Sequence, residues 1–467
     1  MDIILLHESI PIETRRRVFH DTPSDIQRVV ITDEAFIPIR DVKCIIDFGL
    51  KRHMLYDFGY DFFRTFYSWK SRKEAIHITE RSTHSHVSVY RLYNVDEFEE
   101  FYDRNTNQNQ SIQKICAYAE LLADDENSIV SILQNLYDPV SLVYIYFGIK
   151  SLRISNAMDN FGRVTQLGVY VMQLSVPPNL GKMLIHACIL QCLDPVITLV
   201  SFIINGYLSY LENLKYEHFH YFYDGILSSH VMILKLFEEY QECVCYNRNF
   251  GIRYGYSSED MEIILMTRMK LTRELKEIGI IQNKKQRNLA HANMNATNWP
   301  LVQACLVIGH YPKLLHYVKE GCIVLDYCCK KSLSLEGQLK NIISKSSIER
   351  CSIVYNILNA NLTTCNPTGY TVVPELTAFL FCPKVNGMSN YWMYTSVSKK
   401  LYELKKSYEK LVEIRLSYPS IYMAHTEQNI LTSIKKLLML EFNMAALKSP
   451  SFDFSCRMRF CHELKHI

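Results

Sequence analysis

The fold of this 467-residue chain is decided by the stretch Pro177-Pro178-Asn179-Leu180-Gly181-Lys182-Met183-Leu184, followed by Cys192-Leu193-Asp194-Pro195-Val196-Ile197-Thr198. Its paired prolines are a turn signal, and the apolar residues after them recur at helical spacing. The same helical period runs from Ser111 to about Glu277, with turn residues at Asn160-Phe161-Gly162. The middle of the chain is therefore predicted to be a set of packed helices.

Residues 1 to 103 alternate short apolar runs with polar helical stretches. Strand-like runs occur at Ile3 to Leu6, Val29 to Ile31 and Cys44 to Ile46. A helical period covers Ile12 to Phe19. Strands that alternate with helices are typical of a parallel sheet of the α/β class, and we expect such a sheet here.

The pattern changes again between about Cys322 and Cys382. Turn chemistry occurs at Asn366-Pro367-Thr368-Gly369. Three apolar runs around it are predicted to be β-strands: Ile353 to Ile357, Gly369 to Val373 and Ala378 to Phe381.

A last helical block covers Val397 to Leu416 and Glu427 to Leu438. Both segments are amphipathic, with Lys-rich outer positions. An amphipathic face can pack on the rest of its own chain or receive a partner helix. The sequence leaves both alternatives open.

The composition describes a soluble globular protein, with 48% hydrophobic and 21% charged residues. The net charge of +3 gives no global signature of nucleic-acid binding, so any such binding must be local. None of the 15 cysteines lies in a C-x-x-C pair, which predicts buried, reduced thiols of an intracellular protein. No apolar run approaches the roughly 20 residues of a membrane span, and a cytoplasmic location is expected.

The segment from Trp69 to His84, followed by Tyr90-Arg91-Leu92-Tyr93, resembles a motif of the DEAH/RNA helicase A-like (DExH-box) family. That family carries Q-R-x-G-R-x-G-R between W-x-S and Y-R-L-Y, and its arginines reach the ATP phosphates. Five positions of the motif are replaced here, by His77, Ile78, Glu80, Thr83 and His84. Only Arg81 coincides with a motif arginine, which makes it a remnant of a nucleotide motif.

Several other sequence motifs of the family occur here in the same order. The most specific lie in the middle of the chain, where Asn160 to Gly168, Asn179 to Leu184 and Cys192 to Thr198 resemble G-x-L-T-x-L-G, R-L-(G/A)-K-M-L and C-L-D-P-V-L-T. Further similar segments are Leu6 to Phe19, Arg28 to Thr32, Ile39 to Gly49, Asn295 to Ala304 with Gly309 to Pro312, and Val372 to Phe381.

The resemblance implies a multidomain α/β plus α architecture. Its parts would be a partial second RecA-like parallel-sheet lobe (1–103), a winged helix (104–172), a helical ratchet bundle (173–290), an OB-fold β-barrel (291–395) and C-terminal helices (396–467).

Neither ATP nor Mg²⁺ is expected as a cofactor of this chain. A P-loop needs G-x-x-x-x-G-K-[ST], and the one Gly-Lys pair, Gly181-Lys182, is followed by Met183 and lacks the earlier glycine. Asp33-Glu34-Ala35-Phe36 imitates a D-E-A-H box, but its neighbours place it at a later motif. We therefore expect no catalytic residue, and for Arg81 a salt bridge or an RNA phosphate contact, with completion of another lobe's site in trans left open.

No metal site is expected, because the cluster His77, His84 and His86 lacks further ligands at helical spacing. RNA is the expected partner, because basic groups release counterions from phosphate and an OB-type groove adds stacking platforms. The candidate contacts are Arg15, Arg16, Arg17, Lys51, Arg52, Arg163, Lys284, Lys285 and Arg287.

In its loss of ATPase motifs and its retention of the accessory domains, the sequence resembles the insect benign gonial cell neoplasm proteins. That resemblance implies a catalytically inactive RNA-binding regulator that represses translation in germline differentiation together with protein partners, with no membrane or DNA involved. Two alternatives stay open. One is a pseudo-helicase scaffold whose partners bind the RNA, and the other is a C-terminal fragment of an active ATP-dependent RNA helicase.

Overall fold

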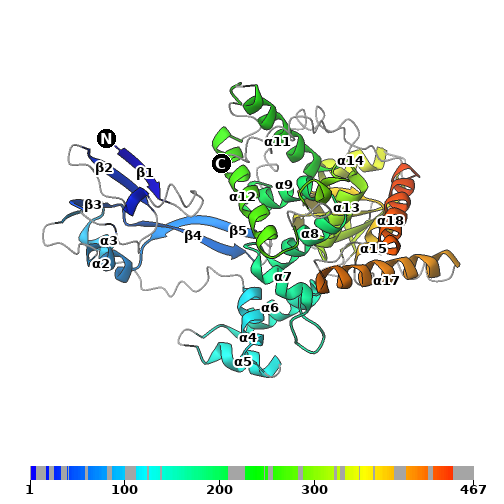
Figure 1. Cartoon of the computed structure of the whole chain (residues 1–467), viewed down its shortest axis with the longest axis horizontal. Coiled ribbons are helices and arrows are strands. Elements are labelled where there is room, and N and C mark those ends of the chain that lie inside the picture. The colour runs from blue at the N-terminus through cyan, green and yellow to red at the C-terminus, as the bar shows by residue number, and fades with distance from the viewer. Residues whose placement is uncertain are drawn as a thin grey trace. The chain divides into compact units, whose positions relative to one another are not determined.

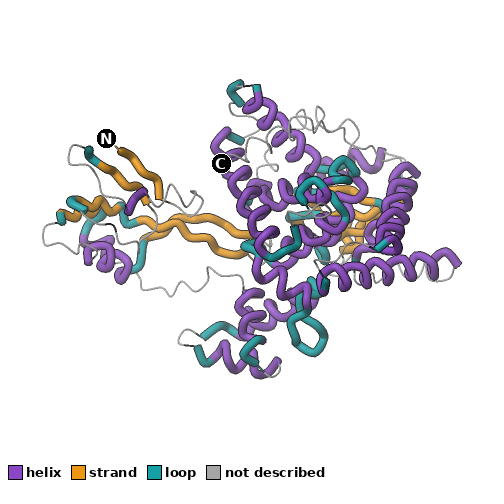
Figure 2. The backbone as a smooth tube through the Cα atoms, viewed as in Figure 1, coloured by secondary structure: helices purple, strands orange, loops and turns teal. Residues whose placement is uncertain are grey.

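The chain folds into two compact units, residues 1–57 with 63–110 and residues 58–62 with 111–467 (Figure 1). The first is built mainly of strands, and the second surrounds one sheet with helices (Figure 2). The computed structural model describes residues 2–6, 17–19, 26–32, 39, 42–57, 62–80, 87–99, 112–123, 126–136, 139–208, 227–246, 248–250, 256–281, 288–319, 323–326, 332–345, 348–360, 363–382, 396–418 and 424–444.

The first unit contains the predicted strands and their parallel pairing. Its elements are β1 (Asp2–Leu6), η1 (Arg17–Phe19), β2 (Arg28–Thr32), β3 (Cys44–Asp47), β4 (Leu50–Asp57), β5 (Phe62–Trp69), α2 (Arg72–Glu80), β6 (Ser88–Arg91) and α3 (Val95–Glu99). Strand β1 pairs in parallel with β2, and β3 pairs in parallel with β6. The described strands form three two-stranded sheets and not the single sheet that we expected.

One prediction for this unit is only partly covered by the described residues. Of the helix expected over Ile12 to Phe19, the structure describes Arg17–Phe19, which form a 3₁₀ turn.

The second unit begins with helices, which confirms the helical prediction for the described residues of this region. They are α4 (Ile112–Glu120), α5 (Glu126–Gln134), α6 (Leu142–Ile154), α7 (Gln166–Gln173), α8 (Pro178–Ile189), α9 (Leu193–Ile204), α11 (Ser229–Cys245), α12 (Ser258–Glu277), η4 (His291–Asn293) and α13 (Trp299–His310). Four of these helices begin with a side-chain N-cap, from Thr165, Ser228, Ser257 or Asn298. Such caps satisfy N–H groups that have no partner inside the helix.

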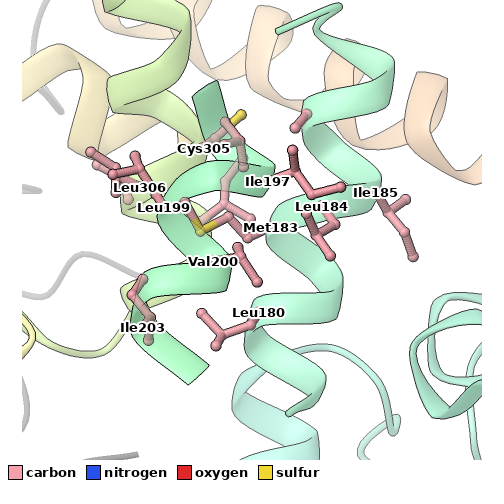
Figure 3. Close-up of a cluster of buried hydrophobic side chains, with 14 of the residues drawn as sticks. Leu180, Met183, Leu184, Ile185, Ile197, Leu199, Val200, Ile203, Cys305 and Leu306 are labelled. Carbon is pink, nitrogen blue, oxygen red and sulfur yellow. The ribbon is translucent and has the colours of Figure 1, made fainter. Parts of the chain in front are cut away.

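Helices α8, α9 and α13 form the centre of the core (Figure 3). Figure 3 shows the side chains of Leu180 and Met183 of α8 on the side of this helix that faces α9. All 12 residues of α13 are buried, including the polar Gln303 and His310. A helix that is apolar on every side must be enclosed, and here α8, α9, α15, α18 and the sheet enclose it.

The segment Leu193-Asp194-Pro195 begins α9, and Asp194 fixes it to α12. The Arg268 Nη2 atom of α12 donates to Asp194 Oδ1 at 2.6 Å, and Arg268 also donates to the Asp194 carbonyl and to the Thr198 hydroxyl. The Arg268 guanidinium lies 5.0 Å from the ring centre of Phe237 in α11. Three helices therefore meet at one guanidinium group.

The sheet of the second unit has seven strands in the order β11-β12-β9-β8-β7-β10-β13. They are β7 (Leu314–Val318), β8 (Ile323–Asp326), β9 (Ser332–Leu335), β10 (Arg350–Val354), β11 (Ile357–Ala360), β12 (Thr364–Thr368) and β13 (Thr371–Val373), with α14 (Gly337–Lys345) between β9 and β10. All pairs are antiparallel except β9 with β12.

The two faces of this sheet belong to different apolar clusters. Leu314 and Val354 join the helical core, whereas their neighbours Leu315 and Ile353 join a second cluster that α14 covers. Side chains alternate between faces along a strand, which explains the division.

Three predictions for this region are wrong. The run Ile353 to Ile357 is not one strand, because β10 ends at Val354 and β11 begins at Ile357. The run Ala378 to Phe381 is not a strand but part of helix α15 (Glu375–Phe381), because a short, fully buried apolar run does not distinguish the two forms. Its N-terminus follows Pro374, and the Glu441 carboxylate accepts from the Leu376 N–H at 2.7 Å. The predicted turn Asn366 to Gly369 begins later than expected, because β12 extends to Thr368 and only Gly369 has the positive φ of +59°.

Both predicted C-terminal helices are present, as α17 (Ser396–Ser417) and α18 (His425–Met444). Their buried stripes belong to the main core, with Tyr408 and Leu411 from α17 and Leu438 from α18. The Tyr408 hydroxyl lies 2.7 Å from His186 Nδ1 of α8. These amphipathic faces pack on their own chain.

Seven of the ten cysteines in the described part are buried, and none of the ten forms a disulfide. The Sγ atoms of Cys192 and Cys305 lie 3.6 Å apart in the core, and burial raises the pKa of Cys305 well above its usual value. No helix among the described residues is long and apolar enough to span a bilayer.

Replacing Arg268 by Ala should lower the free energy of unfolding by roughly 3 kcal/mol, because the largely buried Asp194 carboxylate loses its charge partner. Urea denaturation of the two proteins measures the difference. The control is Arg273→Ala on the same helix, whose pair with Glu277 is exposed, and its effect should stay below about 0.5 kcal/mol. Equal effects of the two substitutions would contradict the stabilising role of the Arg268–Asp194 ion pair.

Acid should destabilise the fold through buried histidines. Burial lowers the pKa of His310 to about 4 and that of His186 to about 3, and it holds the pKa of His230 well below 6.5. The unfolded chain binds protons at these rings below about pH 6.5 and the folded chain does not, so the free energy of unfolding should fall by a few kcal/mol between about pH 6.5 and 4. Denaturation curves across this range measure the effect.

His310→Phe should flatten this pH dependence, because the unfolded chain then binds one proton fewer relative to the folded chain as the pH falls. The exposed His425 of α18 provides the control, and His425→Gln should leave the profile as it is. A profile that His310→Phe does not change would show that His310 does not contribute to the acid sensitivity.

Candidate nucleic-acid interface

In the first unit, the buried Asp47 organises the residues around the altered arginine motif. Its carboxylate accepts from Lys70 Nζ at 2.5 Å, from the Gly49 N–H at 3.0 Å and from the Tyr93 hydroxyl at 3.0 Å. Burial alone would raise the Asp47 pKa, but these hydrogen bonds and the Lys70 charge hold it below its usual value. Burial and the bond to Asp47 raise the pKa of Tyr93 to about 12.

The flanks of the altered motif meet at the same place. The rings of Trp69 and Tyr93 are 6.3 Å apart, and both lie against Gly49. A Cβ on Gly49 would come within 2.6 Å of the Tyr93 ring, and its φ of +72° also favours glycine. Residues of the W-x-S and Y-R-L-Y motifs thus make packing and hydrogen-bonding contacts. Arg81 lies outside the described residues, one position after the end of α2.

The structure describes few of the predicted RNA contacts. Arg15, Arg16, Lys284, Lys285 and Arg287 lie outside the described residues, and for Lys51 and Arg52 only the backbone of β4 is described. Arg17 pairs with Asp2 at 3.1 Å, so part of its charge is neutralised within the chain. Arg163 is described and exposed.

Arg163 belongs to a tight turn, residues 159–163, between the bridged residues Met158 and Val164. The Asp159 carboxylate accepts from the N–H groups of Phe161 at 2.8 Å and Arg163 at 2.9 Å, and the Asp159 N–H donates to the Arg163 carbonyl. Gly162 takes the positive φ of +85° that such a turn requires. The turn is therefore defined by its own hydrogen bonds.

Phe161 at the tip of this turn is 84% exposed, the highest value among the large apolar side chains in the described part of the chain. The Arg153 Nη2 atom of α6 donates to the Asn160 carbonyl at 3.3 Å, so a second guanidinium lies against the turn. An exposed ring can stack on a base and arginines can neutralise phosphate in single-stranded nucleic acid, and this turn offers both residue types.

The base of the turn is tightly packed. Thr165 caps α7 by accepting from the Gly168 N–H at 3.0 Å, and its hydroxyl donates to the Asn156 carbonyl at 2.7 Å. A Cβ on Gly168 would lie 2.1 Å from the Ala157 carbonyl oxygen, so no other residue fits this approach. The motif T-x-L-G, here Thr165 to Gly168, therefore makes close contacts that position the turn.

Sequence reasoning named Arg163 as a candidate contact but did not name Phe161 or Arg153. The available signal was the word Asp159-Asn160-Phe161-Gly162, in which a turn-forming acid and glycine bracket an aromatic residue. A ring between such residues has little opportunity to enter a core. Arg153 had no such signal, because its contact depends on the packing of α6.

A cavity of about 410 Å³ opens elsewhere on the second unit, among the C-terminal end of α8, residues 280–281, η4, α17 and α18. Its lining includes Arg415 and Lys435, and none of the described lining residues carries a carboxylate. No group of three or more His, Cys, Asp or Glu side chains in the described part of the chain could hold a metal ion.

Comparison with known proteins identifies similarity to helicases. Residues 177–207, which contain α8 and α9, match the ratchet-like helicase associated domain (HA2). The chain is 24% identical to the ATP-dependent DNA/RNA helicase DHX36 of Mus musculus, over 67% of this chain and 32% of that protein. It is 24% identical to the DExH-box ATP-dependent RNA helicase DExH1 of Arabidopsis thaliana, over 68% of this chain and 33% of the relative.

A further relative is the protein benign gonial cell neoplasm of Drosophila melanogaster, at 26% identity over 49% of this chain and 21% of that protein. The chain thus spans about a third or less of the length of these relatives.

Phe161→Ala should weaken the binding of single-stranded RNA by about 1–2 kcal/mol, because one stacking platform is lost. Fluorescence anisotropy with a labelled oligonucleotide measures the change. The control is Tyr146→Ala, which removes another exposed ring from α6 and should leave the affinity unchanged. If the two variants bind RNA equally well, the turn is not a contact.

Proposed function

We propose that the chain is a member of the DExH-box/RNA helicase A-like family and an RNA-binding regulator without unwinding activity, which the similarity to these helicases supports. The observation that carries the proposal is the hydrogen-bonded turn 159–163, which exposes Phe161, contains Arg163 and has the Arg153 guanidinium bonded to its backbone. A turn whose backbone is fixed by its own hydrogen bonds needs little further ordering of that backbone when it binds, which favours stacking of its exposed ring on a base. The remaining basic candidates, Lys284, Lys285 and Arg287 among them, would add phosphate contacts.

The proposal includes the domain order of the family. Parallel pairing of β1 with β2 and of β3 with β6 supports a partial second RecA-like lobe in residues 1–103. The turn 159–163 next to α7 would be the wing of a winged helix (104–172). The match at residues 177–207 supports a ratchet bundle (173–290), and the antiparallel strands from β7 onward support an OB-fold (291–395). Helices α17 and α18 would form the C-terminal extension (396–467).

Absence of unwinding rests on the nucleotide motifs. The chain carries no G-x-x-x-x-G-K-[ST] sequence, and the altered arginine motif retains only Arg81. An arginine finger assists phosphoryl transfer only when a P-loop lobe holds the nucleotide opposite to it. We therefore propose that ATP and Mg²⁺ are not cofactors of this chain.

The biological setting is proposed from similarity to the benign gonial cell neoplasm protein, whose name refers to germ cells. In that setting the chain would repress translation in the cytoplasm during germline differentiation, together with protein partners. Neither DNA nor a membrane is part of the proposal.

A second candidate function is a protein scaffold that does not touch RNA itself. It is favoured by apolar side chains at the surface of the α4–α6 region, where Leu121, Leu122 and Val143 are each more than 60% exposed. Exposed apolar clusters commonly mark protein–protein contacts.

Ultraviolet crosslinking of labelled single-stranded RNA to the purified full chain separates the two functions. The regulator should crosslink above the level of an unrelated control protein, and its complex should weaken as salt rises, because phosphate contacts release counterions. Binding of protein partners without any RNA crosslink would favour the scaffold.

ATP hydrolysis by the same preparation should not exceed the background without protein, with or without RNA. Arg81→Ala should have no effect on this background. RNA-stimulated hydrolysis that Arg81→Ala abolishes would show that the chain is an active enzyme.

A further inference from the structure

The cavity of about 410 Å³ on the second unit has the size of a small-molecule site, since such sites typically measure about 300–1,000 Å³. Part of its wall is apolar, with Ile185 and Ile189 from α8, Ile281 after α12 and Leu431 from α18. An apolar wall of this kind suits the face of a planar ring.

The other part of the wall is polar and basic. Lys435 of α18 and Arg415 of α17 line it, and Arg415 is held by an ion pair with Glu427 at 2.5 Å. None of the described lining residues carries a carboxylate, so Lys435 supplies the positive charge of the cavity, while Arg415, whose charge Glu427 balances, supplies further N–H donors. The Lys435 ammonium has three N–H donors, and the contact described for it, to Asn295 Oδ1 at 2.6 Å, uses one.

Hydrogen bonds fix the direction of the polar side chains in this wall. Lys435 donates to Asn295 Oδ1, so the Asn295 amide directs its Nδ2 atom to Gln191 Oε1 at 3.1 Å. Gln191 then presents its own Nε2 atom to His291 Nε2 at 2.9 Å. The side chains of Lys435, Asn295, Gln191 and His291 are therefore linked in one hydrogen-bonded series. Their fixed orientation can recognise the hydrogen-bond donors and acceptors of a ligand.

Gln191 also has an unusual backbone. Its φ is +62°, and it ends α8 in a Schellman arrangement, with the Cys192 N–H bonded to the Ala187 carbonyl and the Gln191 N–H to that of Cys188. Glycine is the residue that adopts this conformation without strain. The conformation is strained for any residue with a side chain, and here that side chain lies in the polar wall of the cavity.

We propose that this cavity binds a nucleoside monophosphate unit, with the base against the isoleucine and leucine wall and the phosphate at Lys435 and Arg415. The unit is either a free mononucleotide or one nucleotide of a bound RNA strand. The second source rests on the proposed RNA-binding function, and the first does not.

The test measures the binding of AMP and UMP to the full chain by isothermal titration calorimetry. Lys435→Gln should weaken binding roughly tenfold or more, because a charged donor to the phosphate is lost. The matched control is Lys436→Gln, which removes the same charge from the next, exposed residue of α18 and should have no effect. Inorganic phosphate serves as a second ligand and should bind more weakly than AMP.

A second variant separates binding from folding. Gln191→Gly suits the positive φ, so it should keep or raise the melting temperature, and it should weaken nucleotide binding because the amide is gone. Phosphate binding as tight as that of AMP, or equal binding by the Lys435→Gln and Lys436→Gln variants, would overturn the proposal.

The same variants with a single-stranded oligonucleotide identify the source of the nucleotide. If free AMP does not bind up to about 10 mM but Lys435→Gln alone weakens RNA binding, the site takes a nucleotide of the strand. If RNA binds the wild type and Lys435→Gln changes neither ligand's affinity, the inference fails and the proposed function stands. If AMP binding depends on Lys435 but RNA does not bind at all, the proposed function fails and the site stands.

Discussion

The burial of α13 on every side is the constraint on which the second unit depends. An apolar helix without a solvent-facing side must be enclosed by several elements at once, and α8, α9, α15, α18 and strand β10 supply the enclosure. This arrangement also explains the polar exceptions of the core. His310 bonds to the Leu306 carbonyl and Gln303 to the Val372 carbonyl, so each enters an apolar region with a partner.

The family words in this sequence correspond to contacts that hold the fold together. Asp194 and Thr198 bind Arg268, Asn298 caps α13, and Gly168 admits the Ala157 carbonyl oxygen. None of these contacts requires a nucleotide. The motifs that this sequence shares with helicases therefore reflect packing contacts of the fold. Such contacts can be kept in a chain whose arginine motif is altered.

Helical periodicity predicted the elements of the second unit well, because long amphipathic or apolar helices announce themselves over many residues. It failed at Ala378 to Phe381, where burial on all sides removes the period that would tell helix from strand. The site was predicted less completely. Arg163 stood out by its charge, whereas Phe161 is distinguished only by its exposure in the folded chain. Gln191 and Lys435 lie far apart in the sequence and are connected only through Asn295.

The seven-stranded sheet shares one of its faces with the helical core, through Leu314, Val354 and Val373. A boundary that separates helices from strands would cut through this common apolar cluster. Water would then reach side chains from both sides of the cut, and neither part would keep the contacts that stabilise it. Helices and sheet should consequently melt together in a single transition, as one cooperative unit.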